Sequence, residues 1–90
     1  MVDKVIKTAA GQVCCDLDGE AVILSLKTGQ YYGLDGVGAR VWALIQEPKN
    51  VSDLLNTLLS EFDVEAGVCE RDLWLLLEDL NEAGLVEIAG

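Results

Sequence analysis

The side chains that most often do chemistry in proteins are few in this sequence. It holds three cysteines, Cys14, Cys15 and Cys69, and no histidine, so the commonest general base and metal ligand is missing. Cys14 and Cys15 are neighbours in a predicted strand, where successive side chains point to opposite faces and cannot share one metal ion. Cys69 has neither a histidine nor a basic cluster beside it to lower its pKa. We interpret all three as buried or half-buried thiols, and predict no catalytic residue, no metal site and no cofactor.

Alternating acidic residues form a second candidate site. Asp16, Asp18 and Glu20 resemble the start of a calcium-binding loop, but the glutamate that such a loop needs downstream is missing. Asp18-Gly19 predicts a tight hairpin turn instead, because both residue types tolerate a positive φ. The glycines after residue 30 form no phosphate-binding pattern. The chain therefore carries no recognisable catalytic apparatus, and binding is the function to look for.

The elements that would position a binding site follow from the hydrophobic pattern. Three β-rich runs separated by turns predict an antiparallel meander over residues 13–17, 20–26 and 30–34. Helical patterns follow over about 36–47, 51–62 and 66–83. Short strands are open alternatives to loops for Val2, Val5 and Ile6 near the start, and to a tail for residues 86–88.

Local signals mark where these helices begin and end. Asp35 and Asn50 are predicted N-caps, with Asp53 completing a motif like a capping box. Pro48 stops the first helix, and Gly84 is the expected left-handed C-cap of the third. The prediction is a single α+β domain over residues 1–90, in which a three-stranded antiparallel sheet is followed by three helices. This layout is close to a winged helix-turn-helix.

Composition limits the partners of such a domain. The 90 residues are 51% hydrophobic and carry a net charge of −10, which disfavours nucleic acid and anionic membranes as partners. The third predicted helix is strongly acidic, with Arg71 as its only basic residue, so it would be repelled by a DNA groove. A winged-helix DNA-binding or dimerisation module stays the alternative function. An odd cysteine count, with no signal peptide or membrane span recognised, predicts a soluble cytoplasmic protein.

Two surfaces remain as candidate binding sites. The strand at residues 30–34 is the last of the meander and should leave an unpaired edge, where Gly33 has no side chain to block another backbone. On the third helix, the core stripe is expected to be Leu73, Leu76, Leu77 and Leu80. Trp74 lies outside that stripe, so it either widens the core or forms one wall of an apolar groove for a peptide.

The central stretch resembles a known family. Y-Y-G-L-D-x-V-G-A-R-V-W-x-L, from Tyr31 to Leu44, is similar to the family of pyrroloquinoline-quinone biosynthesis protein D (PqqD), which exemplifies the peptide-recognition element of ribosomal peptide pathways. The similarity spans roughly residues 12–88. It is greatest to the stand-alone leader-binding proteins of lasso-peptide biosynthesis, with Asp35 in place of the more usual asparagine.

The resemblance implies a non-catalytic function. A precursor's leader peptide would add as an antiparallel strand along residues 30–34, with apolar side chains in the cleft between that strand and the third helix. The complex would then be delivered to a separate leader peptidase and a macrolactam cyclase, and the unfilled edge also allows homodimers. The peptide-binding residues expected from this are Gln30, Tyr31, Tyr32, Gly33, Leu34, Glu70, Asp72, Leu73, Trp74, Leu77 and Glu78.

Overall fold

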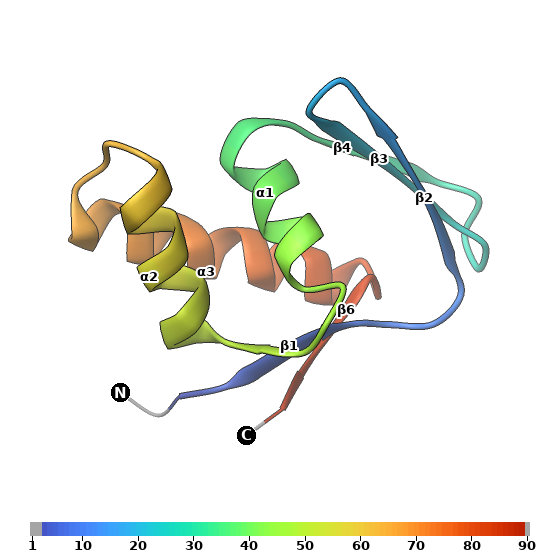
Figure 1. Cartoon of the computed structure of the whole chain (residues 1–90). Helices are drawn as coiled ribbons and strands as arrows, with labels where there is room; N and C mark the ends of the chain where they lie inside the picture. The colour runs from blue at the N-terminus through green and yellow to red at the C-terminus, as the bar shows by residue number, and fades with distance from the viewer. Residues whose placement is uncertain (1–2, 90) are drawn as a thin grey trace.

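A computed structural model of the chain describes residues 3–89, which form two small sheets and three helices (Figure 1). The elements in chain order are β1 (Val5–Thr8), β2 (Gln12–Leu17), β3 (Glu20–Ser25), β4 (Tyr31–Leu34), α1 (Gly36–Leu44), β5 (Lys49–Asn50), α2 (Val51–Glu61), α3 (Ala66–Glu82) and β6 (Val86–Ala89). The predicted α+β order of a meander followed by three helices is confirmed.

The predicted meander is the sheet β2-β3-β4. Its first turn is formed by Asp18 and Gly19, which both have a positive φ, at 49° and 81°. Cross-strand pairs run from Gln12↔Ser25 to Leu17↔Glu20 between β2 and β3, and from Ala21↔Leu34 to Leu24↔Tyr31 between β3 and β4. Ala21 and Ile23 of β3 are buried, so one face of this sheet packs against the rest of the molecule.

A second sheet, in the order β5-β1-β6, was not predicted as a sheet. Val5 pairs with both Asn50 and Ala89, which joins the beginning, the middle and the end of the chain. Val2, at the edge of the expected N-terminal strand, lies outside the described residues. The strands of this sheet are short and far apart in sequence, so no local pattern predicts that they pair. Their pairing depends on how the helices fold back between them.

The side-chain hydrogen bonds predicted for the two N-cap residues are wrong. Asp35 and Asn50 occupy the N-cap positions, but neither side chain makes a capping hydrogen bond. The carboxylate of Asp3 accepts from the backbone N–H (3.1 Å) and the hydroxyl (2.8 Å) of Ser52 instead. Asp3 reaches the start of α2 because β1 pairs with β5 immediately before that helix. These bonds hold the pKa of Asp3 below its ordinary value.

Helix α1 ends earlier than predicted, at Leu44 and not near Glu47. The side-chain amide of Gln46 donates to the carbonyl oxygen of Trp42 (2.9 Å), which satisfies one of the carbonyls that a continued helix would have paired. Gly84, in contrast, has the expected left-handed conformation after α3, with φ at 76°.

The core lies where the three helices meet the inner faces of both sheets. Its fully buried large side chains are Ile6, Ile23, Val41, Ile45, Leu54, Leu58, Leu77 and Leu85. Arg40 and Glu61 join α1 to the end of α2 by two hydrogen bonds of 2.7 and 2.8 Å, and Arg40 holds the pKa of Glu61 below its ordinary value. Within residues 3–89, none of the helices has the length and apolarity that crossing a bilayer requires.

Candidate functional site

The free edge of β4 presents main-chain hydrogen-bonding groups. In the described residues β4 pairs only with β3, and the amide of Ser25 donates to the carbonyl oxygen of Gln30 (2.9 Å). The N–H and C=O of one residue in an antiparallel strand point to the same side, and the side alternates along the strand. Tyr32 therefore bonds to β3, as Gln30 does, whereas the groups of Tyr31 and Gly33 point to the open edge.

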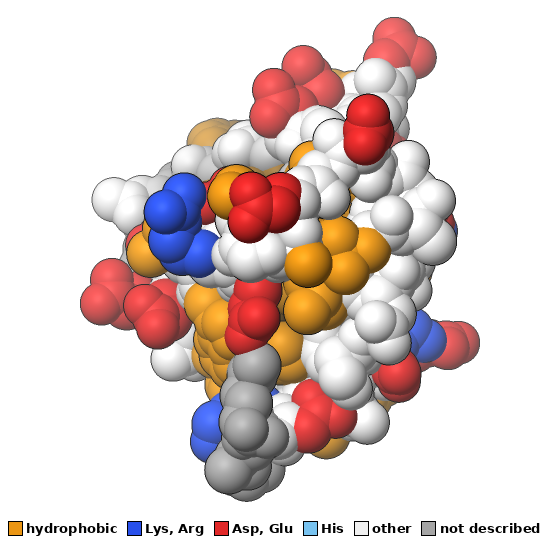
Figure 2. All heavy atoms as spheres, turned by 90° about the vertical axis from the view of Figure 1, so that its left-hand side faces the viewer, with side chains coloured by type: hydrophobic (Ala, Val, Ile, Leu, Met, Phe, Trp, Pro, Cys, Tyr) orange, Lys and Arg blue, Asp and Glu red, His pale blue; other side chains and the backbone are white. Residues whose placement is uncertain are grey.

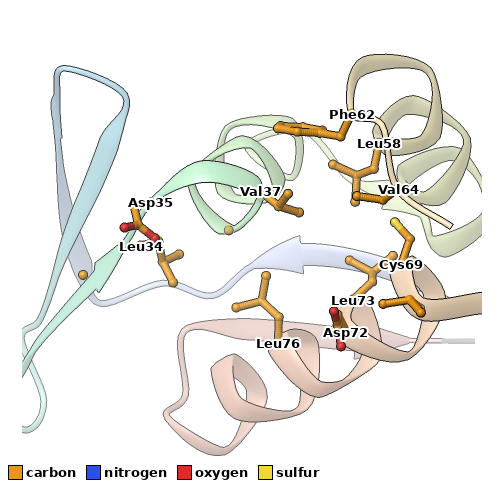
Figure 3. Close-up of a pocket in the computed structure, with 13 residues that line it drawn as sticks. Leu34, Asp35, Val37, Leu58, Phe62, Val64, Cys69, Asp72, Leu73 and Leu76 are labelled. Carbon is orange, nitrogen blue, oxygen red and sulfur yellow. The ribbon is translucent and has the colours of Figure 1, made fainter. Parts of the chain in front are cut away.

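A cleft of about 340 Å³ begins where β4 ends. Gly33 and Leu34 line its near end, and it extends between the start of α1, the end of α2 and the first half of α3. Figure 3 shows Leu76 pointing from α3 towards Leu34 and Val37. The full lining is Gly33, Leu34, Asp35, Val37, Gly38, Leu58, Phe62, Val64, Val68, Cys69, Asp72, Leu73 and Leu76. A volume of this size is at the lower end for ligand pockets, and fits one or two side chains of a partner.

Leu77 was predicted to contact the peptide and Leu76 was not, but on α3 it is Leu76 that lies at the cleft. Leu77 is fully buried in the core and does not line the cleft, whereas Leu76 is half-buried and forms part of its wall. Adjacent helical residues differ in direction by about 100°, since 3.6 residues make one turn. On α3 the cleft is lined by Val68 and by the set Cys69, Asp72, Leu73 and Leu76, which has the spacing i, i+3, i+4, i+7.

The aromatic side chains expected at the site lie beside the cleft. Tyr32 and Trp74 are half-buried and pack against the core, and neither lines the cleft. Tyr32 also donates its hydroxyl proton to Oε1 of Gln30 (3.0 Å). Tyr31 is 71% exposed on the opposite, outer face of the sheet. Of the two alternatives for Trp74, the structure therefore favours packing at the margin of the core.

Acidic side chains lie on both walls of the cleft. Asp35 follows β4 and Asp72 lies on α3, and both are exposed. Glu70 and Glu78, also predicted to contact a peptide, lie on α3 outside the lining residues. On the face of the molecule that Figure 2 shows, apolar side chains gather in patches and acidic side chains outnumber basic ones around them. Such a site would attract a partner with apolar anchors and basic neighbours.

Cys69 lines the cleft and is the one buried cysteine of the chain. Burial, together with the negative charge of Asp72, raises the pKa of its thiol, which keeps it protonated and unreactive at neutral pH. Cys14 and Cys15 are exposed, which contradicts the expectation of buried or half-buried thiols. They lie on β2, the outer strand of its sheet. The Sγ of Cys14 accepts a hydrogen bond from Nε1 of Trp42 (3.0 Å).

The outer face of the sheet β2-β3-β4 is also apolar. The register places Val13, Leu24 and Tyr31 in one row across the three strands, with Cys15, Val22 and Gly33 in the next. Val13 and Leu17 are each more than half exposed. Contiguous exposed apolar surface of this kind is typical of an interaction site.

Some of the residues predicted from the sequence lie at this cleft or at the open edge. Of the predicted residues, Gly33, Leu34, Asp72 and Leu73 line the cleft, and Tyr31 joins Gly33 at the open edge. The lining from α1, α2 and the segment between α2 and α3 was missed, including Val37, Phe62 and Val64. No local signal marks these residues, because they belong to patterns that are equally typical of a core. The i, i+3, i+4, i+7 set on α3 was readable from the sequence.

Comparison with known proteins finds a matching family and two structures of similar fold. The family model for coenzyme PQQ synthesis protein D (PqqD) matches residues 20–86. A solved structure of TbiB1 in complex with the TbiA(beta) leader peptide is 37% identical, covering 90% of this chain and 94% of that chain with a TM-score of 0.85. A lasso peptide synthetase B1 complexed with the leader peptide is 24% identical, covering 91% and 96% with a TM-score of 0.81, and shows likeness of fold. No curated protein sequence matches. By its sequence and by its fold, this chain belongs to the PqqD family.

Proposed function

We propose that this protein binds the leader peptide of a ribosomally made precursor and does no chemistry itself. The observation that carries the proposal is the continuity of the open β4 edge with the apolar cleft, which share Gly33. A guest strand would pair with the edge and place apolar side chains in the cleft, which is a common mode of peptide recognition. The 37% identity to TbiB1, solved with a leader peptide, supports this type of ligand.

Main-chain pairing would supply affinity that depends little on peptide sequence. Tyr31 and Gly33 each offer one N–H and one C=O at the open edge, as the hydrogen-bond register requires. Each bond contributes a net of about 0.5–1.5 kcal/mol. Side chains in the cleft would supply the specificity.

A guest antiparallel to β4 would have a defined polarity. β4 runs from Tyr31 towards the cleft, so the earlier residues of the guest would lie in the cleft and the later ones beside Tyr31. Basic residues of the guest near Asp35 or Asp72 would contribute selectivity more than affinity, because both carboxylates are exposed to solvent.

Fluorescence polarisation with the labelled TbiA(beta) leader peptide tests this function, because the TbiB1 neighbour was solved with that peptide. Saturable binding with a dissociation constant at or below tens of micromolar is expected, and a flat titration over that range contradicts the proposal. Molar mass measured by light scattering at each concentration shows whether homodimers occupy the edge and compete. A gel shift at low salt tests the DNA-binding alternative, for which the acidic α3 predicts no shift.

We propose further that the bound leader is handed to a separate leader peptidase, and the core peptide to a cyclase. The outer sheet face, with Val13 and Leu24 in one row, is an apolar surface on which an enzyme could dock without covering the cleft. Val13→Glu is expected to leave the affinity for the leader peptide unchanged and to slow its cleavage by the peptidase. Equal cleavage by the two proteins would exclude this face as the docking surface.

A further inference from the structure

Gly38 lies in the first turn of α1, between Leu34 and Leu76. A Cβ added there would be 3.6 Å from Cβ and Cδ2 of Leu34, and 4.0 Å from Cδ2 of Leu76. These are ordinary van der Waals distances, and the φ of Gly38 is not in the left-handed region. The free protein would therefore accept alanine at this position without strain, although glycine is the poorer helix former.

The other glycine at the start of this helix has a conformational reason. Gly36 has a φ of 52°, which disfavours any other residue. No such reason exists for Gly38, and no backbone atom is among the closest neighbours that its Cβ would meet. What a side chain at Gly38 would occupy is the cleft itself, because Gly38, Leu34 and Leu76 all line it.

We propose that Gly38 determines the specificity of the cleft, by keeping the space between Leu34 and Leu76 open for one bulky apolar side chain of the guest peptide. The inference rests on the proposed function and adds to it the size of the guest side chain that enters this space, which we call the anchor. Apart from Asp35 and Asp72, the side chains that line the cleft are apolar, with Val37 next to the two leucines, so a large apolar group would be in contact on several sides. A small side chain would leave much of this space unfilled.

The variant Gly38→Ala tests this with Gly67→Ala as the matched control. Gly67 lies in the first turn of α3, does not line the cleft, and its added Cβ would meet only the flexible end of Glu65 at 3.3 Å. Both variants are expected to melt at or above the temperature of the wild type. Gly38→Ala should bind the labelled TbiA(beta) leader peptide about tenfold more weakly, because an extra methyl overfills an occupied cleft. Gly67→Ala should bind like the wild type.

Single-alanine variants of that peptide identify the anchor. For the peptide that has lost its anchor, the affinities of the wild type and of Gly38→Ala should agree within about twofold, since the two changes then remove the same contact. Equal binding of the full peptide by the two proteins overturns the inference and leaves the proposed function standing. The inference is also overturned if Gly38→Ala binds every peptide variant about tenfold more weakly than the wild type does.

A small aromatic probe tests Gly38 independently of any peptide. Titration of p-cresol, followed by the methyl NMR signals of Leu34, Val37 and Leu76, should give saturable shifts in the wild type and in Gly67→Ala. The shifts should be strongly reduced in Gly38→Ala. Absence of shifts in the wild type, or equal shifts in all three proteins, overturns the inference even where the peptide itself does not bind.

Discussion

Replacing Gly33 with proline should weaken peptide binding about tenfold or more while leaving the fold intact. The register directs the N–H of Gly33 to the open edge, so its loss breaks no bond to β3. Proline is tolerated in edge strands when its missing N–H faces solvent. Apart from the two chain neighbours, no atom lies within 4 Å of a Cβ added at this position, so a side chain there meets open space. The free energy of unfolding should therefore change by less than about 1 kcal/mol.

The effect on binding should be larger. The substitution removes one hydrogen bond to the guest and leaves a guest carbonyl unpaired, at a cost of about 1–3 kcal/mol. The lower part of this range corresponds to roughly tenfold weaker binding. Fluorescence polarisation with the labelled TbiA(beta) leader peptide measures the affinity, and thermal unfolding followed by circular dichroism measures stability.

Two neighbouring variants make this test specific. Gly33→Ala keeps the N–H and adds a side chain, so it should bind within a few-fold of the wild type. Tyr32→Pro removes an N–H that bonds to β3 and should destabilise the protein. If Gly33→Pro folds and binds the peptide as the wild type does, the guest does not pair with this edge and the register reasoning is wrong.

Three further predictions concern the packing of α3, the ion pair of Glu61 and the accessibility of the thiols. Leu77→Ala should destabilise the protein by about 2–5 kcal/mol, because its side chain is fully buried, whereas Leu76→Ala should mainly weaken peptide binding; chemical denaturation and peptide titration separate the two effects. Arg40 lowers the pKa of Glu61 in the folded state, so their ion pair stabilises the fold above pH 4.5, the ordinary pKa of Glu61, and this stabilisation is lost as the pH falls below that value. The difference in melting temperature between the wild type and Glu61→Gln should therefore shrink as the pH is lowered below 4.5. Maleimide should modify Cys14 and Cys15 quickly and Cys69 slowly, and bound peptide should slow Cys69 further, as mass spectrometry of partly labelled protein would show.

Features that depend on short stretches of sequence were predictable. The alternation of β2, β3 and β4, the turn at Asp18-Gly19 and the left-handed Gly84 depend on neighbouring residues in the chain. The three helices likewise follow from apolar spacing and were found within a few residues of their predicted bounds. The motif from Tyr31 to Leu44 also indicated the family, which the match over residues 20–86 confirms.

Tertiary structure decided what each of these elements contacts. Helical spacing marks Leu76 and Leu77 as apolar, but only the crossing of α3 with α1 and α2 puts Leu77 in the core and Leu76 in the cleft. Likewise, the start of α2 is capped by Asp3, whose partner Ser52 is 49 residues away, because β1 pairs with β5. Local sequence fixes which residues are apolar or strand-forming, whereas burial and long-range pairing depend on surfaces that distant segments create only when they pack together.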